Sequence, residues 1–170
     1  NCQYTRNYSG CKICGRSGGN CMEIERKFLP LMDHLPFHPQ DYPCRRIEQG
    51  YLCTDPVVRI RRDNDEYFLT YKSKGLMVRE EYNLPLTRSA YEHLLTKADG
   101  RIITKNRFVI PLENNLKLEL DIFEGDLAPL VIAEIEFPDE ESARSYQPPE
   151  WLGEDVTYSS KYHNSTLSRL

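Results

Sequence analysis

Polar and apolar residues alternate over many short segments of this chain, as they do in β-strands whose two faces differ. The clearest case is the segment 23–29, EIERKFL. As a strand it places Glu23, Glu25 and Lys27 on one face, whereas Arg26 falls on the other face with the apolar residues. The segment has no apolar stripe at helical spacing. It therefore predicts a strand with one charged face and one mainly apolar face.

Seven further segments show a similar alternation and are separated by turn residues. The additional predicted strands are 45–52, 57–62, 67–72, 77–82, 102–110, 116–123 and 130–137. Thr54-Asp55-Pro56 predicts a hairpin turn, and the proline-rich stretch 30–43 predicts an irregular connection because proline interrupts helices and central strands.

Helical spacing is confined to a few places. The segment 87–98 carries apolar residues at helical spacing and begins with a candidate N-cap, Thr87. A shorter helix is expected over 139–146, where Asp139 is the candidate cap, and another from Ser160.

Eight antiparallel strands at short spacing predict a barrel or a strongly curved sheet, within an α+β class that is mainly β. The charges sort by strand: acidic pairs lie on the first, seventh and eighth predicted strands, and basic pairs on the third and sixth. Solvated outer faces usually mix both signs. We therefore expect an eight-stranded tunnel whose charged faces point inward and whose helices pack outside. The alternative is a barrel with an apolar interior and charges in solvent.

A charged interior requires water or a ligand, because an unpaired buried charge is costly. Basic residues that converge from several strands favour a chain of phosphates. Neighbouring carboxylates suit a hard divalent cation, Mg²⁺ or Mn²⁺, that bridges to phosphate oxygens. This combination indicates phosphoryl transfer.

Composition narrows the classes of partner. The net charge is −4, with 39% hydrophobic and 28% charged residues, so there is no basic bias toward a nucleic acid polymer. No apolar run is long enough to cross a membrane. We expect a soluble cytoplasmic protein that acts on a small molecule, and the oligomeric state stays open.

Four of the six cysteines lie in the first 21 residues, at Cys2, Cys11, Cys14 and Cys21. They are compatible with a zinc site or with a disulfide framework. We favour a third interpretation: residues 1–21 are a disordered leader or a non-native extension, translation begins at Met22, and 22–170 form the domain.

The charged segments also follow a known order. Glu23-x-Glu25-x-Lys27 resembles the ExExK signature of the CYTH superfamily, the triphosphate tunnel metalloenzymes. The resemblance continues in order through VRIR at 58–61, TYKSKG at 70–75, Arg79-x-Glu81, ITKNRF at 103–108, ELDIFEG at 119–125 and AEIEF at 133–137. It covers essentially residues 22–170.

This resemblance implies an eight-stranded antiparallel tunnel that binds a triphosphate and needs a divalent metal. The residues expected to hold the triphosphate are Lys27, Arg59, Arg61, Lys72, Lys105 and Arg107. The expected metal ligands and acidic lining are Glu23, Glu25, Glu134, Glu136, Glu81, Glu119 and Asp121. Those expected to act most directly in catalysis are Glu23, Glu25, Lys27 and Lys72. The chain departs from many relatives at Asn83, where they carry a second acid.

The compact form that opens with EIERKFL resembles bacterial members that hydrolyse inorganic tripolyphosphate to pyrophosphate and phosphate. The alternatives are a class IV adenylate cyclase, a thiamine or nucleoside triphosphatase, and a module that binds polyphosphate without catalysis. Removal of a clamp cation, such as Lys72 or Arg59, is expected to lower activity and to leave the fold intact or more stable.

Overall fold

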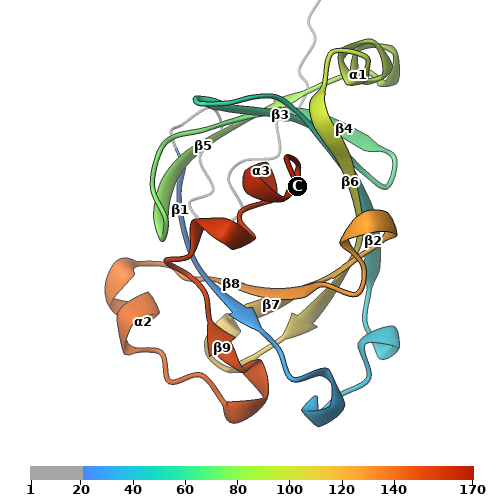
Figure 1. The fold of residues 1–170 in the computed structure, drawn as a ribbon. Helices are drawn as coiled ribbons and strands as arrows, with labels where there is room; N and C mark the ends of the chain where they lie inside the picture. Colours follow the sequence, from blue (N-terminus) through green and yellow to red (C-terminus); the bar gives the residue numbers. More distant parts are fainter. Residues whose placement is uncertain (1–20) are drawn as a thin grey trace, which may run out of the picture.

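Residues 21–170, the part of the chain that this computed structural model describes, form one antiparallel sheet of nine strands (Figure 1). The strands are β1 (Cys21–Leu29), β2 (Cys44–Thr54), β3 (Val57–Asp63), β4 (Glu66–Lys72), β5 (Val78–Pro85), β6 (Asp99–Pro111), β7 (Lys117–Phe123), β8 (Val131–Glu136) and β9 (Glu154–Asp155). Their order is β5-β4-β3-β2-β6-β7-β8-β1-β9, and a further pairing between β5 and β1 closes the first eight into a barrel. The predicted eight-stranded antiparallel barrel is confirmed.

Strand β1 is the seam of the barrel. Its first half pairs with β5, from Cys21 to Ile24, and its second half pairs with β8, from Glu25 to Phe28. The last residues of β1 also pair with the short β9. In this register Lys27 lies opposite Glu134 across the β1–β8 ladder.

The larger apolar core lies outside the barrel wall. Phe28, Leu118, Leu120 and Ile135 are fully buried on β1, β7 and β8, in the opposite phase to the charged residues of these strands. Helix α2 (Glu140–Ser145) and the connections around it cover them, and Ala143 of α2 belongs to the same cluster. The prediction that the apolar faces point outward and are covered is therefore correct for this half of the barrel.

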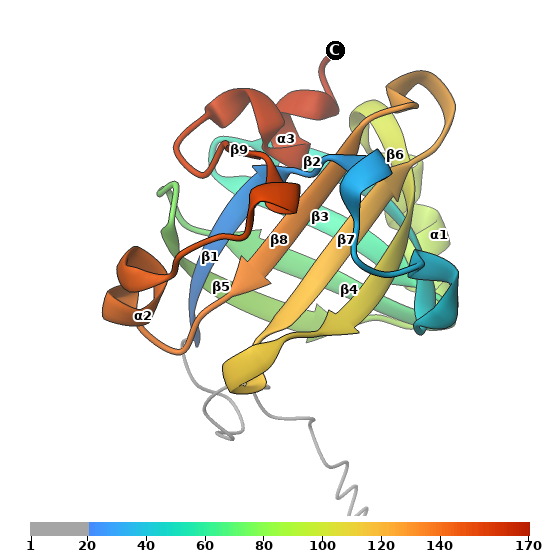
Figure 2. The same cartoon turned by 90° about the horizontal axis from the view of Figure 1, so that it is seen from below.

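Helix α1 (Arg88–Leu95) packs against the outer face of β3 and β4 on the other side of the barrel (Figure 2). Thr87 caps it as predicted, accepting a hydrogen bond from the Ala90 amide. The helix is shorter than predicted because β6 already begins at Asp99. The connection that follows α1 approaches the sheet so closely at Gly50 that a Cβ there would lie 2.9 Å from the Ala98 Cβ.

The C-terminal segment closes one end of the barrel. Figure 1 looks along the barrel and shows helix α3 (Asn164–Leu167) across the opening. Leu167 packs there against Tyr51, Ile103 and Phe123 from β2, β6 and β7. The helix predicted from Ser160 is instead a 3-10 turn followed by this single short α-helix.

The remaining helical segments of residues 21–170 are short 3-10 turns in the connections. They are Met32–His34, Pro39–Asp41, Glu113–Asn115, Gly125–Leu127, Glu150–Leu152 and Ser160–Tyr162. The proposed leader concerns residues 1–20, which lie outside the described residues, together with Cys21, whose backbone belongs to β1. None of the helices within 21–170 has the length and apolar character that a membrane-spanning helix needs.

Candidate active site inside the barrel

The predicted site residues come together on the inner side of the barrel, from every barrel strand except β2. Ion pairs between strands that are not neighbours in the sheet establish this placement. Lys72 on β4 contacts Glu23 on β1 at 2.5 Å, and Arg107 on β6 contacts Glu134 on β8 at 2.8 Å. Side chains two strands apart converge on the concave inner face of a barrel and diverge on its convex outer face, so these contacts place the residues inside.

The densest part of the network lies on β6, β7 and β8. Arg107 binds Asp121 with two parallel hydrogen bonds of 2.6 and 2.7 Å, and it also contacts Glu119. Lys105 contacts the same aspartate, and both side chains are almost completely buried. Burial lowers the pKa of Lys105 to about 8 even beside this carboxylate. Asp121 therefore holds two cations in place.

Lys27 joins this network to β1. Its ammonium lies 2.7 Å from Glu25 and 2.7 Å from Glu134. Burial alone would raise the pKa of Glu134, but Lys27 and Arg107 hold it well below its usual range. Glu134 is thus a fixed anion between two cations.

Lys72 is shared by two carboxylates on the opposite side. It lies 2.5 Å from Glu23 and 2.7 Å from Glu81. Burial raises the pKa of Glu23, and the nearby charges of Glu25 and Glu81 raise it further. Lys72 lowers it, but the net result is a pKa of about 8. Asn83, the departure from the family pattern, donates to Glu81 at 2.5 Å and accepts from the Thr70 hydroxyl at 2.6 Å. The Lys72 ammonium group therefore contacts two acidic side chains at once.

Arg59 and Arg61 on β3 differ from Lys27, Lys72, Lys105 and Arg107, because no carboxylate of residues 21–170 lies within ion-pair distance of either. Neither Nε atom has a hydrogen-bond partner there, although both atoms are buried. Burial, Arg59 and Arg107 lower the pKa of Arg61 to about 10. Gln49 on β2 lies opposite Arg61 in the ladder, fully buried, and its amide also lacks a partner within the described chain. This side of the interior therefore has hydrogen-bond donors without partners and two arginines that form no ion pair within the described chain.

The closed barrel and its charged interior agree with a family model described as the CYTH domain, which matches residues 22–169. The chain belongs to the CYTH domain family. An inorganic triphosphatase from Nitrosomonas europaea is 38% identical over 149 residues, which are 86% of this chain and 96% of the relative. An inorganic triphosphatase from Acetivibrio thermocellus is 37% identical over 150 residues, covering 85% and 92%. A crystal structure of an inorganic triphosphatase matches with a TM-score of 0.64 and 36% identity, over 86% of this chain and 93% of that chain.

The carboxylates of this CYTH domain suit a hard divalent cation by their chemistry. Glu25 and Glu136 lie opposite each other on β1 and β8, and Glu23 shares the inner face with Glu25. Partial burial, then Glu119 and Glu25, raise the pKa of the more exposed Glu136 to about 7. Such crowding of acids is what a divalent cation relieves. Within 21–170, however, no three acidic, His or Cys side chains converge in a ready ligand set, because lysines occupy several of these carboxylates.

Sequence reasoning missed three participants. Gln49 and Tyr51 on β2 face the interior, and Tyr51 lies opposite Arg59 in the ladder, where the pKa of Arg59 is raised, against the effect of burial, by Tyr51, Glu81 and Glu23. The sequence offers little indication of this, because the inner face of β2 carries no pair of like charges comparable to those of the other strands. His163 comes from the C-terminal segment, and burial followed by Lys27 and Arg79 lowers its pKa to about 4. Nothing in the local sequence indicates that it reaches the barrel.

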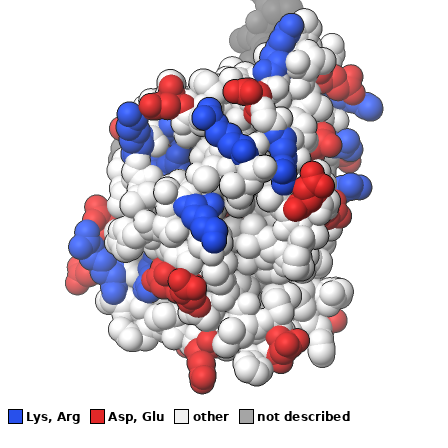
Figure 3. Space-filling model, viewed as in Figure 1, with Lys and Arg blue, Asp and Glu red and all other residues white. Residues whose placement is uncertain are grey.

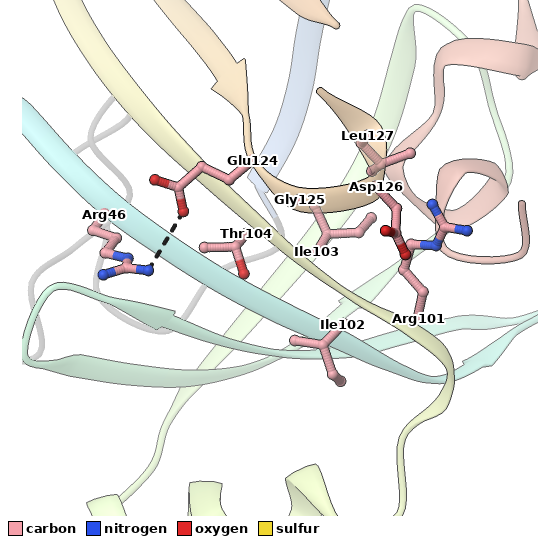
Figure 4. A pocket seen from close by; sticks show the side chains of 9 residues that line it. All are labelled: Arg46, Arg101, Ile102, Ile103, Thr104, Glu124, Gly125, Asp126 and Leu127. Atoms are coloured by element: carbon pink, nitrogen blue, oxygen red, sulfur yellow. Dashed lines mark hydrogen bonds and ion pairs between the residues drawn. The ribbon is translucent and has the colours of Figure 1, made fainter. Parts of the chain in front are cut away.

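The outer surface offers no stronger candidate for a functional site within the described residues. A cavity of about 450 Å³ lies on the outer side of β2 and β6, where Arg46 pairs with Glu124 at 3.4 Å (Figure 4). None of the predicted site residues lines it. Figure 3 shows acidic and basic side chains interspersed on the closed end, without one continuous patch of either sign.

Proposed function

We propose that this protein hydrolyses a linear triphosphate bound inside the barrel, in the first place inorganic tripolyphosphate, to pyrophosphate and orthophosphate. The observation that carries the proposal is the unused cationic side of the interior. Arg59, Arg61 and Gln49 offer hydrogen-bond donors without partners in the described chain, and neither arginine has an ion pair there. A chain of phosphates supplies the anionic oxygens that these groups lack. The two relatives named inorganic triphosphatase, 38% and 37% identical, support the same substrate.

Lys27, Arg59, Arg61, Lys72, Lys105 and Arg107 are the residues that we assign to the triphosphate. In hydrolysis a water oxygen bonds to the terminal phosphorus, the bond to the bridging oxygen breaks, and pyrophosphate leaves with the electron pair. The proton lost by the water passes to solvent or to a carboxylate. The cations stabilise the charge that moves onto the bridging oxygen, and their fixed positions avoid reorganisation during the reaction.

Glu23, Glu25, Glu134 and Glu136 are the residues that we assign to a divalent cation, Mg²⁺ or Mn²⁺. When bound, such a cation supplies further neutralisation of phosphate oxygens. Asp121 and Glu119 were expected among the metal ligands. We now assign them mainly to positioning, because both oxygens of Asp121 already bind Arg107. We likewise assign Glu81 mainly to positioning, because it forms an ion pair with Lys72 at 2.7 Å.

Phosphate release from tripolyphosphate, ATP and thiamine triphosphate, measured with Mg²⁺ or Mn²⁺ alongside cyclic AMP formation, tests the proposal. We expect tripolyphosphate to give the highest kcat/KM and EDTA to abolish turnover. Arg59→Gln is the matched inactive variant, because Arg59 has no ion pair in residues 21–170 whose loss would disturb the fold. Cyclic AMP as the main product would contradict the proposal in favour of a cyclase. Tight binding of tripolyphosphate without turnover of any substrate would leave a binding module.

A further inference from the structure

A second, smaller cavity lies at the closed end of the barrel. Its volume is about 220 Å³, and it is bounded by the β2–β3 turn, the β4–β5 turn and the C-terminal segment. We call it the rim cavity. Its polar lining includes Lys72, Ser73, Lys74, Arg79, Ser160 and His163. Three of these six side chains are cations, and hydroxyl groups supply further donors, whereas the one acidic residue of the lining, Asp55, pairs with Lys74.

Arg79 is the main feature of the rim cavity. It is 9% exposed, and its Nε donates to the Ser73 carbonyl at 3.2 Å. This bond fixes the plane of the guanidinium and leaves its two terminal nitrogens available. Glu23 lies opposite Arg79 in the β1–β5 ladder but contacts Lys72 instead. No carboxylate within 21–170 lies at ion-pair distance from Arg79. A buried, oriented guanidinium without a counter-charge is a strong donor for an anion.

The rim cavity adjoins the interior site at Lys72, which lines the cavity and contacts Glu23 and Glu81 inside the barrel. His163 stands at the same boundary, and its buried Nε2 has no hydrogen-bond partner in the described chain. Lys74 marks the outer rim, where its largely exposed side chain pairs with Asp55 at 3.2 Å. Donors therefore run from the interior through the cavity to the surface.

We propose that the rim cavity binds one phosphoryl group beyond the three that the interior holds, with Arg79 as its principal donor. This inference rests on the proposed function, because the position of a further phosphoryl group is defined by a triphosphate in the barrel. The same chemistry has two sources. It is either the fourth phosphoryl of a longer linear polyphosphate or the orthophosphate released by hydrolysis.

The test compares Arg79→Gln with Arg88→Gln, a matched control on the outside of the barrel whose side chain is 74% exposed. One arm measures kcat/KM for tripolyphosphate and tetrapolyphosphate, and the other measures inhibition of tripolyphosphate hydrolysis by orthophosphate. Loss of a charge-assisted hydrogen bond lowers binding about 10-fold or more. We expect Arg79→Gln to lower kcat/KM for tetrapolyphosphate by that factor, or to weaken orthophosphate inhibition by it. Tripolyphosphate hydrolysis should change less than about 3-fold.

A shift in the first arm identifies the fourth phosphoryl, and a shift in the second identifies orthophosphate. Equal losses for both substrates with unchanged orthophosphate inhibition would assign Arg79 to the interior site and overturn the inference. So would values that match Arg88→Gln in both arms. Wild-type protein without tripolyphosphatase activity would instead contradict the proposed function. Lys74→Gln guards against misfolding of Arg79→Gln, because this side chain is 87% exposed, and it should shift the same arm by about 3-fold.

Discussion

Arg26 and Lys27 are consecutive cations on β1 whose side chains lie on opposite sides of the barrel wall. Lys27 points inward to Glu25 and Glu134. Arg26 points outward, where it pairs with Asp155 at 2.6 Å and donates to the carbonyl oxygens of Ala143 and Tyr146 at 3.0 and 2.8 Å. One cation thus belongs to the interior site, and the other fastens the C-terminal connections to the outer wall.

Arg26→Gln and Lys27→Gln should therefore have different effects. Lys27→Gln removes a preorganised charge and should lower kcat/KM for tripolyphosphate by about 10²–10³-fold. Arg26→Gln should lower the free energy of unfolding by about 1–3 kcal/mol, because buried carbonyl oxygens lose their donor. Its kcat/KM, corrected for the folded fraction, should stay near the wild-type value. Denaturant titration and initial rates measure both effects, and an equal loss of kcat/KM in the two variants would contradict the assigned faces.

Arg61→Gln and Lys72→Gln should change stability in opposite directions while both lower activity. Arg61 has no counter-charge among the described residues, and its lowered pKa shows that folding disfavours its charge. Its replacement should raise the free energy of unfolding by about 1–2 kcal/mol. Lys72 holds the pKa of Glu81 well below its usual range against the effect of burial, so its replacement should leave a buried anion without its partner and destabilise the protein. The expectation from sequence that any clamp cation can be removed without loss of stability now holds only for cations like Arg61. A stabilised Lys72→Gln would show that Glu81, and not only Glu23, is protonated in the folded protein.

The pH dependence of stability should reveal the crowded carboxylates. In the folded protein without metal, the pKa of Glu23 is raised to about 8 and that of Glu136 to about 7. A carboxyl group with a raised folded pKa stabilises the fold most when it is protonated, so its contribution falls as pH rises toward the folded pKa. The melting temperature in EDTA should therefore fall between pH 6.5 and 8. His163, with a pKa lowered to about 4, opposes this fall only in part near pH 6.5, where it is still partly protonated in the unfolded chain, and its opposing effect fades as the pH rises further.

Mg²⁺ should reduce this fall, because a bound divalent cation favours the ionised carboxylates. The double variant Glu23→Gln/Glu136→Gln is the control and should melt at a nearly constant temperature over the same range. A wild-type melting temperature that rises from pH 6.5 to 8 without metal would be inconsistent with raised pKa values for these two groups.

Ile135→Asp should abolish folding. Ile135 alternates with Glu134 and Glu136 along β8, but its side chain is fully buried in the outer core under α2. Placing a carboxylate there without a partner costs several kcal/mol, a large part of the stability of a domain of this size. Leu84→Asp, at a β5 position that is 56% exposed, is the matched control and should fold normally. Circular dichroism and size-exclusion chromatography distinguish the two outcomes.

The alternation of side chains along each strand explains how much of this structure was predictable from sequence. Because side chains alternate along a strand, the assignment of Lys27 inward and Arg26 outward follows from position alone once one face is known. The barrel, its charged interior and the outer core follow in the same way. The choice of ion-pair partners does not. Lys72 meets Glu23 only because β1 pairs with β5, and closure of this kind depends on the whole sheet.

Three further features could not be predicted from the sequence, because contacts between distant segments determine them. His163 reaches the interior because the last ten residues fold back over the barrel end, a path fixed by contacts such as that of Leu167 with Tyr51. Gln49 was overlooked because glutamine on a strand is usually solvated, whereas here it is fully buried beside Arg61. The end of α1 was misplaced because the start of β6, and not a local stop signal, decides it.

The β1 seam has a consequence for synthesis on the ribosome. Lys27 is synthesised 107 residues before its ion-pair partner Glu134. At about 5–20 residues per second, this interval lasts roughly 5–20 s. During this time the β2–β3–β4 hairpins can form from local contacts, whereas β1 has no β8 to pair with. The first half of β1 can pair with β5 once that strand has emerged, but the second half, Glu25 to Phe28, must stay without its β8 partner until β8 has been synthesised.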